Sequence, residues 1–92
     1  MSLKNFEEQV DYLKELNPDA LLADGFEGAL VGTGRRFNSP YLAVYNYNKC
    51  LRILMERDNM ARDDAVEFME FNVLGAWMGE NTPMFIETCT EM

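Results

Sequence analysis

Carboxylate side chains at helical spacing are the first residues in this chain with types and positions suited to chemistry. Asp63 and Glu67 lie four positions apart and Glu67 and Glu70 three apart, so a helix would place them on one face. Carboxylate oxygens are the ligands that Mg²⁺ and Ca²⁺ prefer. The spacing does not match an EF-hand loop, and we expect no metal site. Asp63, Glu67 and Glu70 are instead candidates for contact with a partner.

Glycines and arginines between residues 25 and 36, in the run GFEGALVGTGRR, invite an anion-binding interpretation. A phosphate loop needs Lys and then Ser or Thr after its last glycine, and a dinucleotide fingerprint needs glycines that open a helix. The run satisfies neither requirement, because its glycines precede or interrupt an expected strand. We therefore predict turn and bulge glycines and no cofactor.

Arg35 and Arg36 form the one adjacent basic pair, at the expected tip of a β-hairpin. A solvated loop is the simpler interpretation. The alternative is that the pair docks against an acidic patch, either on another protein or at the opposite end of another copy. Surplus apolar side chains would also mark a partner surface. The positions considered for it are Phe37, Tyr41, Tyr47 and Met84.

Asn72 interrupts a row of apolar positions in the longest helical pattern of the chain. A buried amide must find hydrogen-bond partners, so we expect Asn72 to bond to backbone where a neighbouring element meets this helix. The alternative is a pocket residue that contacts a ligand together with Tyr45 and Trp77.

The composition excludes several classes of function. Histidine is absent, which removes the commonest general base near neutral pH and the commonest transition-metal ligand. Two cysteines, Cys50 and Cys89, make neither a disulfide framework nor a structural zinc site. The net charge of −8 argues against direct nucleic acid binding. No signal peptide or membrane-spanning run is evident, and we expect a cytoplasmic protein.

Helices and strands along the chain are expected to position these residues. Asn5 or Ser2 is expected to cap a first helix that ends near Leu16, and a short helical turn is possible over residues 18–23. Strands are expected at residues 29–33 and 41–45, joined as a hairpin.

A second helix, capped by Asn46 or Asn48, is expected to stop near residues 58–59. Residues 63–80 predict a central helix with an apolar stripe so wide that other elements must cover it on more than one side. Residues 84–86 are a third strand. Together these predict a single α+β domain over residues 1–92. Its small antiparallel sheet, a β-hairpin plus a C-terminal strand, would pack against two to three helices in the order α-β-β-α-α-β.

Three segments carry a resemblance to known proteins: DGFEGALVG, VYNYNKCLRILMERDNM and DAVEFMEFNVLGAWMGENTPMFI. They span residues 24–86 and resemble a family of small uncharacterised proteins that recurs in bacteriophages and bacteria. Such relatives commonly have glycine at the position of Asn59 and aspartate at the position of Asn46. The resemblance implies an αββααβ-like domain and a viral origin, and it carries over no activity and no site residue.

The sequence predicts a small, acidic, non-enzymatic interaction module that binds another protein or itself. If the chain is viral, a host protein is the natural partner, in the host cytoplasm. The alternative is a domain that binds a small ligand or a divalent metal, through the helix carboxylates or a pocket around Asn72.

Overall fold

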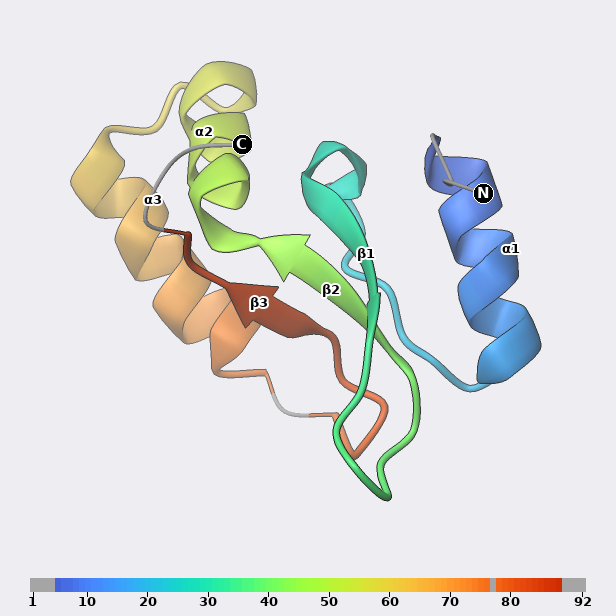
Figure 1. Cartoon of the computed structure of the whole chain (residues 1–92). Coiled ribbons are helices and arrows are strands. Elements are labelled where there is room, and N and C mark those ends of the chain that lie inside the picture. Colours follow the sequence, from blue (N-terminus) through green and yellow to red (C-terminus); the bar gives the residue numbers. More distant parts are fainter. Residues whose placement is uncertain (1–4, 77, 89–92) are drawn as a thin grey trace.

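Helices and a three-stranded sheet make up the part of the chain that this computed structural model describes, residues 5–76 and 78–88 (Figure 1). The labelled elements follow one another as α1, β1, β2, α2, α3 and β3. This confirms the predicted α+β class and the order α-β-β-α-α-β. No helix in these residues is long and apolar enough to span a membrane.

The sheet has the strand order β1 (Leu30–Gly34), β2 (Leu42–Asn46) and β3 (Met84–Ile86). The predicted hairpin is confirmed, because β1 and β2 are antiparallel. The prediction of an entirely antiparallel sheet is wrong: β3 runs parallel to β2, with Tyr45 opposite Phe85. The cause is the connection. The chain leaves β2, crosses through two helices and returns in the same direction, as parallel neighbours require.

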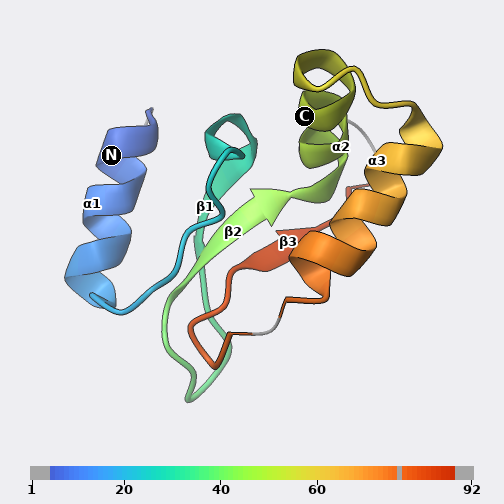
Figure 2. The same ribbon diagram turned by 180° about the vertical axis from the view of Figure 1, so that it is seen from behind.

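Helix α1 (Phe6–Leu16) lies beside β1, at the opposite end of the sheet from α2 and α3 (Figures 1 and 2). Asn5, one of the two predicted capping residues, caps the helix, since its side chain accepts a hydrogen bond from the Glu8 amide at 2.8 Å; Ser2, the other, lies outside the described residues. Leu13 is the residue of this helix that is fully buried. The helix ends at Leu16, as predicted, and Asn17 follows it as the C-cap.

The segment between α1 and the sheet forms no helix at residues 18–23, so the short helical turn that the sequence allows there is absent. Backbone amides of this segment instead form hydrogen bonds with other parts of the fold. The Leu21 amide donates to the carbonyl of Asn81 at 3.2 Å, and the Ala23 amide donates to the Tyr45 hydroxyl at 2.9 Å. A single 3₁₀ turn, η1 (Glu27–Ala29), then leads into β1.

Helix α2 (Tyr47–Arg57) follows β2 without a loop. The Asn46 side chain accepts the Lys49 amide at 3.0 Å, which identifies Asn46 as the cap. Past the helix, Asn59 has a φ of 56°, the left-handed conformation that Asn tolerates better than most residues. Half of the buried apolar residues belong to β2 and α2. The fully buried, larger side chains of the core are Tyr45, Leu13, Leu51, Leu54, Met69, Asn46 and Cys50.

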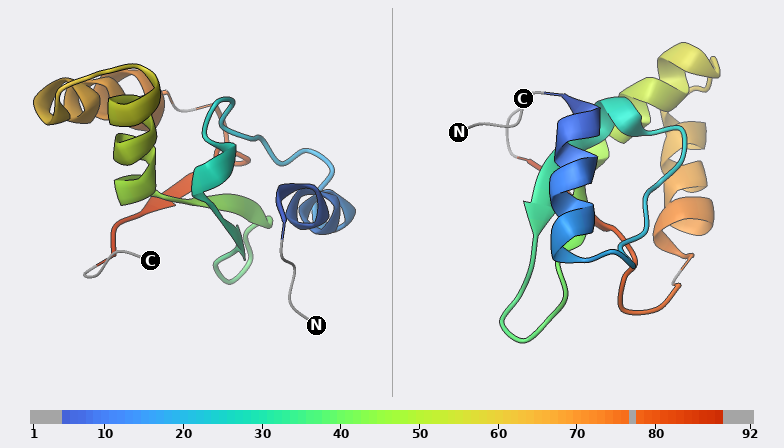
Figure 3. Two further views of the ribbon diagram at one scale, coloured as in Figure 1. Left: turned by 90° about the horizontal axis from the view of Figure 1, so that it is seen from above. Right: turned by 90° about the vertical axis from the view of Figure 1, so that its right-hand side faces the viewer.

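The predicted helix over residues 63–80 is shorter and less regular than expected. It consists of α3 (Arg62–Phe68) and a π-helical continuation, η2 (Met69–Leu74), and it ends at Gly75. In a π-helix each turn holds more residues than in an α-helix, so the side chains beyond Met69 rotate away from the row that an α-helix predicts. The element also lies at the side of the molecule, not at its centre (Figure 3).

Candidate functional site

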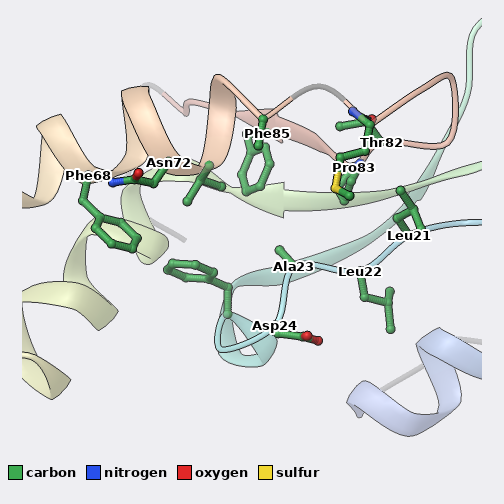
Figure 4. Close-up of a pocket in the computed structure, with 13 residues that line it drawn as sticks. Leu21, Leu22, Ala23, Asp24, Phe68, Asn72, Thr82, Pro83 and Phe85 are labelled. Atoms are coloured by element: carbon green, nitrogen blue, oxygen red, sulfur yellow. Dashed lines mark hydrogen bonds between the residues drawn. The ribbon is translucent and has the colours of Figure 1, made fainter.

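An apolar cleft of about 290 Å³ lies between residues 21–26 and the α3–η2 helix (Figure 4). Three aromatic rings from distant segments line it: Phe26, Phe68 and Phe85. We call this hollow the cleft. Its remaining lining residues are Leu21, Leu22, Ala23, Asp24, Asn72, Val73, Ala76, Met78, Thr82 and Pro83.

The cleft is built on firmly held elements. On one side, residues 21–23 are fixed by the two hydrogen bonds from Leu21 and Ala23 described above. At the sheet, the Phe85 ring stacks on the buried Tyr45 ring, with the centroids 5.4 Å apart and the planes inclined by 22°. A cleft whose walls are tied to the core is largely preformed, as binding sites usually are.

A second, more open hollow of about 640 Å³ adjoins the cleft and shares Phe68 and Asn72 with it; we call it the outer hollow. Its other lining residues are Met60, Asp64, Glu67 and Phe71. Asp24 lines the cleft, so three carboxylates border the two hollows. Among the described residues that line them there is no Lys or Arg. The charged side chains among these described lining residues are therefore all acidic, whereas the Arg57 guanidinium lies outside the lining, 5.8 Å from the centroid of the Phe26 ring.

Large apolar side chains stand exposed next to this site. Phe71 is 76% exposed, Met78 70% and Leu74 40%. The sequence pattern predicted that other elements would cover this helix on more than one side. The structure covers one side, through Ala65 and Met69, and leaves the other open to solvent. An exposed apolar surface beside an apolar cleft is typical of an interaction site.

Asn72 does not have the predicted buried role. It is exposed, because the π-helical turn carries it to the rim, where it lines both hollows. Of its two expected companions, Tyr45 is fully buried beneath the site; its hydroxyl accepts a hydrogen bond from the Ala23 amide, and burial raises its pKa. Trp77 lies outside the described residues. The pocket interpretation of Asn72 thus agrees better with its position than the structural one.

The predicted acidic residues remain on one helix but have different surroundings. Asp63 and Glu67 are exposed, and Glu67 lines the outer hollow. Glu70 accepts a hydrogen bond from the Tyr47 hydroxyl at 2.9 Å. Burial, and then this bond, raise the pKa of Tyr47 to about 12. Within the described residues, no group of three or more Asp, Glu, Cys or His side chains is arranged to hold a metal ion.

Arg35 and Arg36 are exposed at the turn between β1 and β2, as predicted. The Arg35 guanidinium lies 4.6 Å from the centroid of the Tyr41 ring. Of the four apolar positions considered as surplus surface, Phe37 is 94% exposed, whereas Tyr47 is buried. The structure does not bring this basic turn into contact with the acidic helix of the same chain.

Several residues that hold the site together were not singled out from the sequence as polar partners. Asn17 is buried, and its Nδ2 donates to the carbonyl of Tyr41 and to Oδ1 of Asn81, both at 2.8 Å. These bonds join the end of α1 to the sheet and to the loop before β3. The three phenylalanines of the cleft were likewise missed. The abundance of aromatic residues was the available signal, but their convergence depends on the tertiary fold.

Comparison of the chain with protein-family models, with curated proteins and with solved structures finds no match. The resemblance to a family from bacteriophages and bacteria therefore stays a prediction.

Proposed function

We propose that this chain is a small non-enzymatic interaction module that binds a protein partner by holding an apolar side chain of that partner in the cleft. The observation that carries the proposal is the solvent exposure of Met78, which lines the cleft, and of Phe71, which lines the adjoining outer hollow. Soluble proteins seldom leave such side chains grouped on the surface unless a partner covers them.

The carboxylates that border the two hollows, which we call the acidic rim, indicate which charge the partner should carry. Asp24, Asp64 and Glu67 border the two hollows, and opposite charge on a partner would speed its encounter and select it over acidic proteins. The preferred ligand is therefore an apolar, preferably aromatic, side chain next to Lys or Arg. If the chain is viral, as its resemblance implies, a host protein in the cytoplasm would present this segment.

A catalytic role has less support. Asp24 is the one titratable side chain among the described residues that line the cleft. The Thr82 hydroxyl, the one hydroxyl there, donates to the carbonyl of Gly79 at 2.7 Å and accepts the Met78 amide at 2.9 Å. General acid–base or nucleophilic catalysis needs a second group within hydrogen-bond reach of the first.

Selection from a random peptide display library tests the proposal. We expect enrichment of peptides with an aromatic residue next to Lys or Arg. Their binding should be lost in Asn72→Arg, which places a bulky cation at the rim of both hollows. Tyr12→Arg, at a half-exposed position of α1, introduces the same side chain away from the site and should bind as the wild type does. Peptides without a common pattern, or binding that survives Asn72→Arg, would contradict the proposal.

A second candidate is a small apolar ligand in the same cleft, whose volume of about 290 Å³ lies near the lower end of ligand pockets. Thermal melting in the presence of candidate ligands separates the two, because a ligand that binds the folded state raises the melting temperature. A rise with Mg²⁺ or Ca²⁺ would instead favour the metal-binding alternative.

A further inference from the structure

The turn between β1 and β2 has the chemistry that the cleft would select. We call residues 35–39 the hairpin tip. It presents Phe37, 94% exposed, directly after Arg35 and Arg36. An aromatic side chain with two cations beside it is therefore displayed by the chain itself. In Figures 1 and 2 the hairpin tip projects beyond the helices and the rest of the sheet, where another molecule can reach it.

The hairpin tip is an ordered turn. The Ser39 hydroxyl accepts the Arg36 amide at 2.7 Å and donates to the Arg36 carbonyl at 2.8 Å, and the Ser39 amide donates to that carbonyl at 3.1 Å. Asn38 has a φ of 61°, a conformation that Asn adopts more readily than most residues. A preformed turn loses little conformational freedom on binding, which favours its use as a ligand.

The cleft matches this ligand in size and in charge. Apolar cavities of roughly 150 Å³ can accept a benzene ring, so a cleft of about 290 Å³ has room for a phenylalanine side chain. The carboxylates of Asp24, Asp64 and Glu67 border the hollows. Arg35 and Arg36, which precede Phe37, would then lie next to these carboxylates of opposite charge.

We infer that the cleft of one copy receives the hairpin tip of a second copy, with Phe37 as the apolar anchor and Arg35 and Arg36 facing the acidic rim. The inference rests on the proposed function of the cleft and names one partner for it, a second copy of this chain. Because a protruding tip meets a hollow elsewhere on the molecule, two copies that exchange tips reciprocally form an isologous two-fold dimer. Copies that donate their tips in one direction only form heterologous chains.

Sedimentation velocity of the wild-type chain tests the inference first. Each copy carries a net charge of −8, so salt of about 0.15 M is needed, where the screening length is about 8 Å and long-range repulsion is reduced. The sedimentation coefficient should rise with concentration up to about 1 mM, as expected for an association with a dissociation constant in or below that range. A wild-type chain that stays monomeric over this range overturns the inference.

Two variants separate the two halves of the contact. Phe37→Ser removes the anchor from the tip, and Asn72→Arg obstructs the cleft; both positions are exposed, so melting should change little. Each variant alone should raise the dissociation constant at least tenfold. Tyr12→Arg, away from both surfaces, should associate as the wild type does. Association of Phe37→Ser that equals that of the wild type overturns the inference.

Mixing supplies the sharpest test, because Phe37→Ser keeps an intact cleft and Asn72→Arg keeps an intact tip. Equal amounts of the two should form 1:1 dimers and nothing larger, since each pair has a single productive contact. A mixture that remains monomeric, while the wild type associates, overturns the inference.

Charge reversal tests the role of the arginines. Arg35→Glu/Arg36→Glu should weaken self-association at least tenfold. Mixing this variant with Asp64→Arg/Glu67→Arg should restore association, because the opposite charges then meet again. No recovery in the mixture contradicts the assigned pairing between the tip and the acidic rim.

The proposed function of the cleft can be tested separately from self-association. Phe37→Ser retains the cleft and is the appropriate bait for the peptide selection. If Phe37→Ser selects aromatic peptides with basic neighbours and the wild type nevertheless stays monomeric, the cleft binds a different protein and self-association alone is refuted. If it selects no such peptides, the proposed function fails as well.

Discussion

The Tyr47 hydroxyl donates a hydrogen bond of 2.9 Å to Oε2 of Glu70. Tyr47 is the first residue of α2, and Glu70 lies in the π-helical turn η2. The tyrosine is buried and the carboxylate is exposed, so the bond reaches from the core to the helix that carries the cleft. It holds the candidate site in a fixed position on the sheet and α2.

Tyr47→Phe tests this hydrogen bond, because it removes the hydroxyl and keeps the buried ring. We expect a loss of about 1 kcal/mol in the free energy of unfolding, the usual net value of one hydrogen bond. In a domain of this size the melting temperature would fall by roughly 4–8 °C. Tyr12→Phe, at a half-exposed position of α1, should change neither value. Equal melting of Tyr47→Phe and the wild type would show that the bond contributes nothing to stability.

Alkaline pH should destabilise the fold. Burial raises the pKa of the Cys50 thiol from 9.0 to about 12, and burial with the Glu70 bond raises the pKa of Tyr47 from 10.0 to about 12. Both groups bind their protons more tightly in the folded state than in the unfolded one. Their contribution is therefore complete below pH 9 and is lost as the pH rises to about 12.

Urea unfolding between pH 8 and pH 12 measures this loss. The wild type should lose stability steadily above pH 9. Tyr47→Phe should start lower and show a shallower decline between pH 10 and pH 12, since one of the titrating groups is gone. A stability that stays constant up to pH 12 would contradict the assignment.

Asn17→Asp should be strongly destabilising, although it preserves the size of the side chain. The Asn17 Nδ2 donates to the Tyr41 carbonyl and to Oδ1 of Asn81, and a carboxylate would face both of these oxygens without a proton to donate. Loss of hydrogen bonds to a buried polar group predicts a cost of about 2–3 kcal/mol. The comparison variant is Asn5→Asp at the exposed cap of α1. It also loses an Nδ2 donor, to Oε1 of Glu8 at 2.8 Å, but at an exposed position, and aspartate still caps the helix, so we expect a much smaller loss. Chemical denaturation of both variants gives the comparison.

Gly75→Ala should disturb the end of the π-helical turn. A Cβ at this position would lie 3.0 Å from the carbonyl oxygen of Glu70 and 3.1 Å from that of Phe71, so the backbone must shift. We expect a loss of roughly 1–3 kcal/mol. Gly32→Ala is the control, because a Cβ at Gly32 meets nothing within 4 Å. A Gly75→Ala variant as stable as Gly32→Ala would show that the turn adapts without cost.

The sequence predicts the local features of this fold well. Asn5 and Asn46 cap helices because a short polar side chain can reach the amide three residues on, a relation that is visible in the chain itself. The hairpin and the strand over residues 84–86 follow from apolar runs bounded by turn residues. Local sequence patterns do not predict the direction of β3 relative to β2, because this direction depends on the path of the chain through α2 and α3.

The site was predicted less well, for two physical reasons. The apolar period continues past Gly75, so the pattern extends the helix to residue 80, whereas the structure ends the helix at Gly75 after a π-helical turn that the period does not predict. The widened turn at η2 then moves Asn72 from the expected core face to the rim. The cleft is formed by residues 21–26 together with residues from the range 68–85. No local sequence pattern predicts that these two segments lie next to each other. The acidic side chains and the exposed arginines were identified correctly as surface.

The parallel pairing of β2 with β3 has a consequence for synthesis in the cell. Residues 44–46 pair with residues 84–86, so β2 lacks its second neighbour until both intervening helices have been made. A ribosome that stalls in this interval displays a strand edge with open amides and carbonyls, the kind of surface on which nascent chains aggregate. Slow codons or truncations between these two segments should therefore reduce the yield of folded protein more than the same changes between β1 and β2.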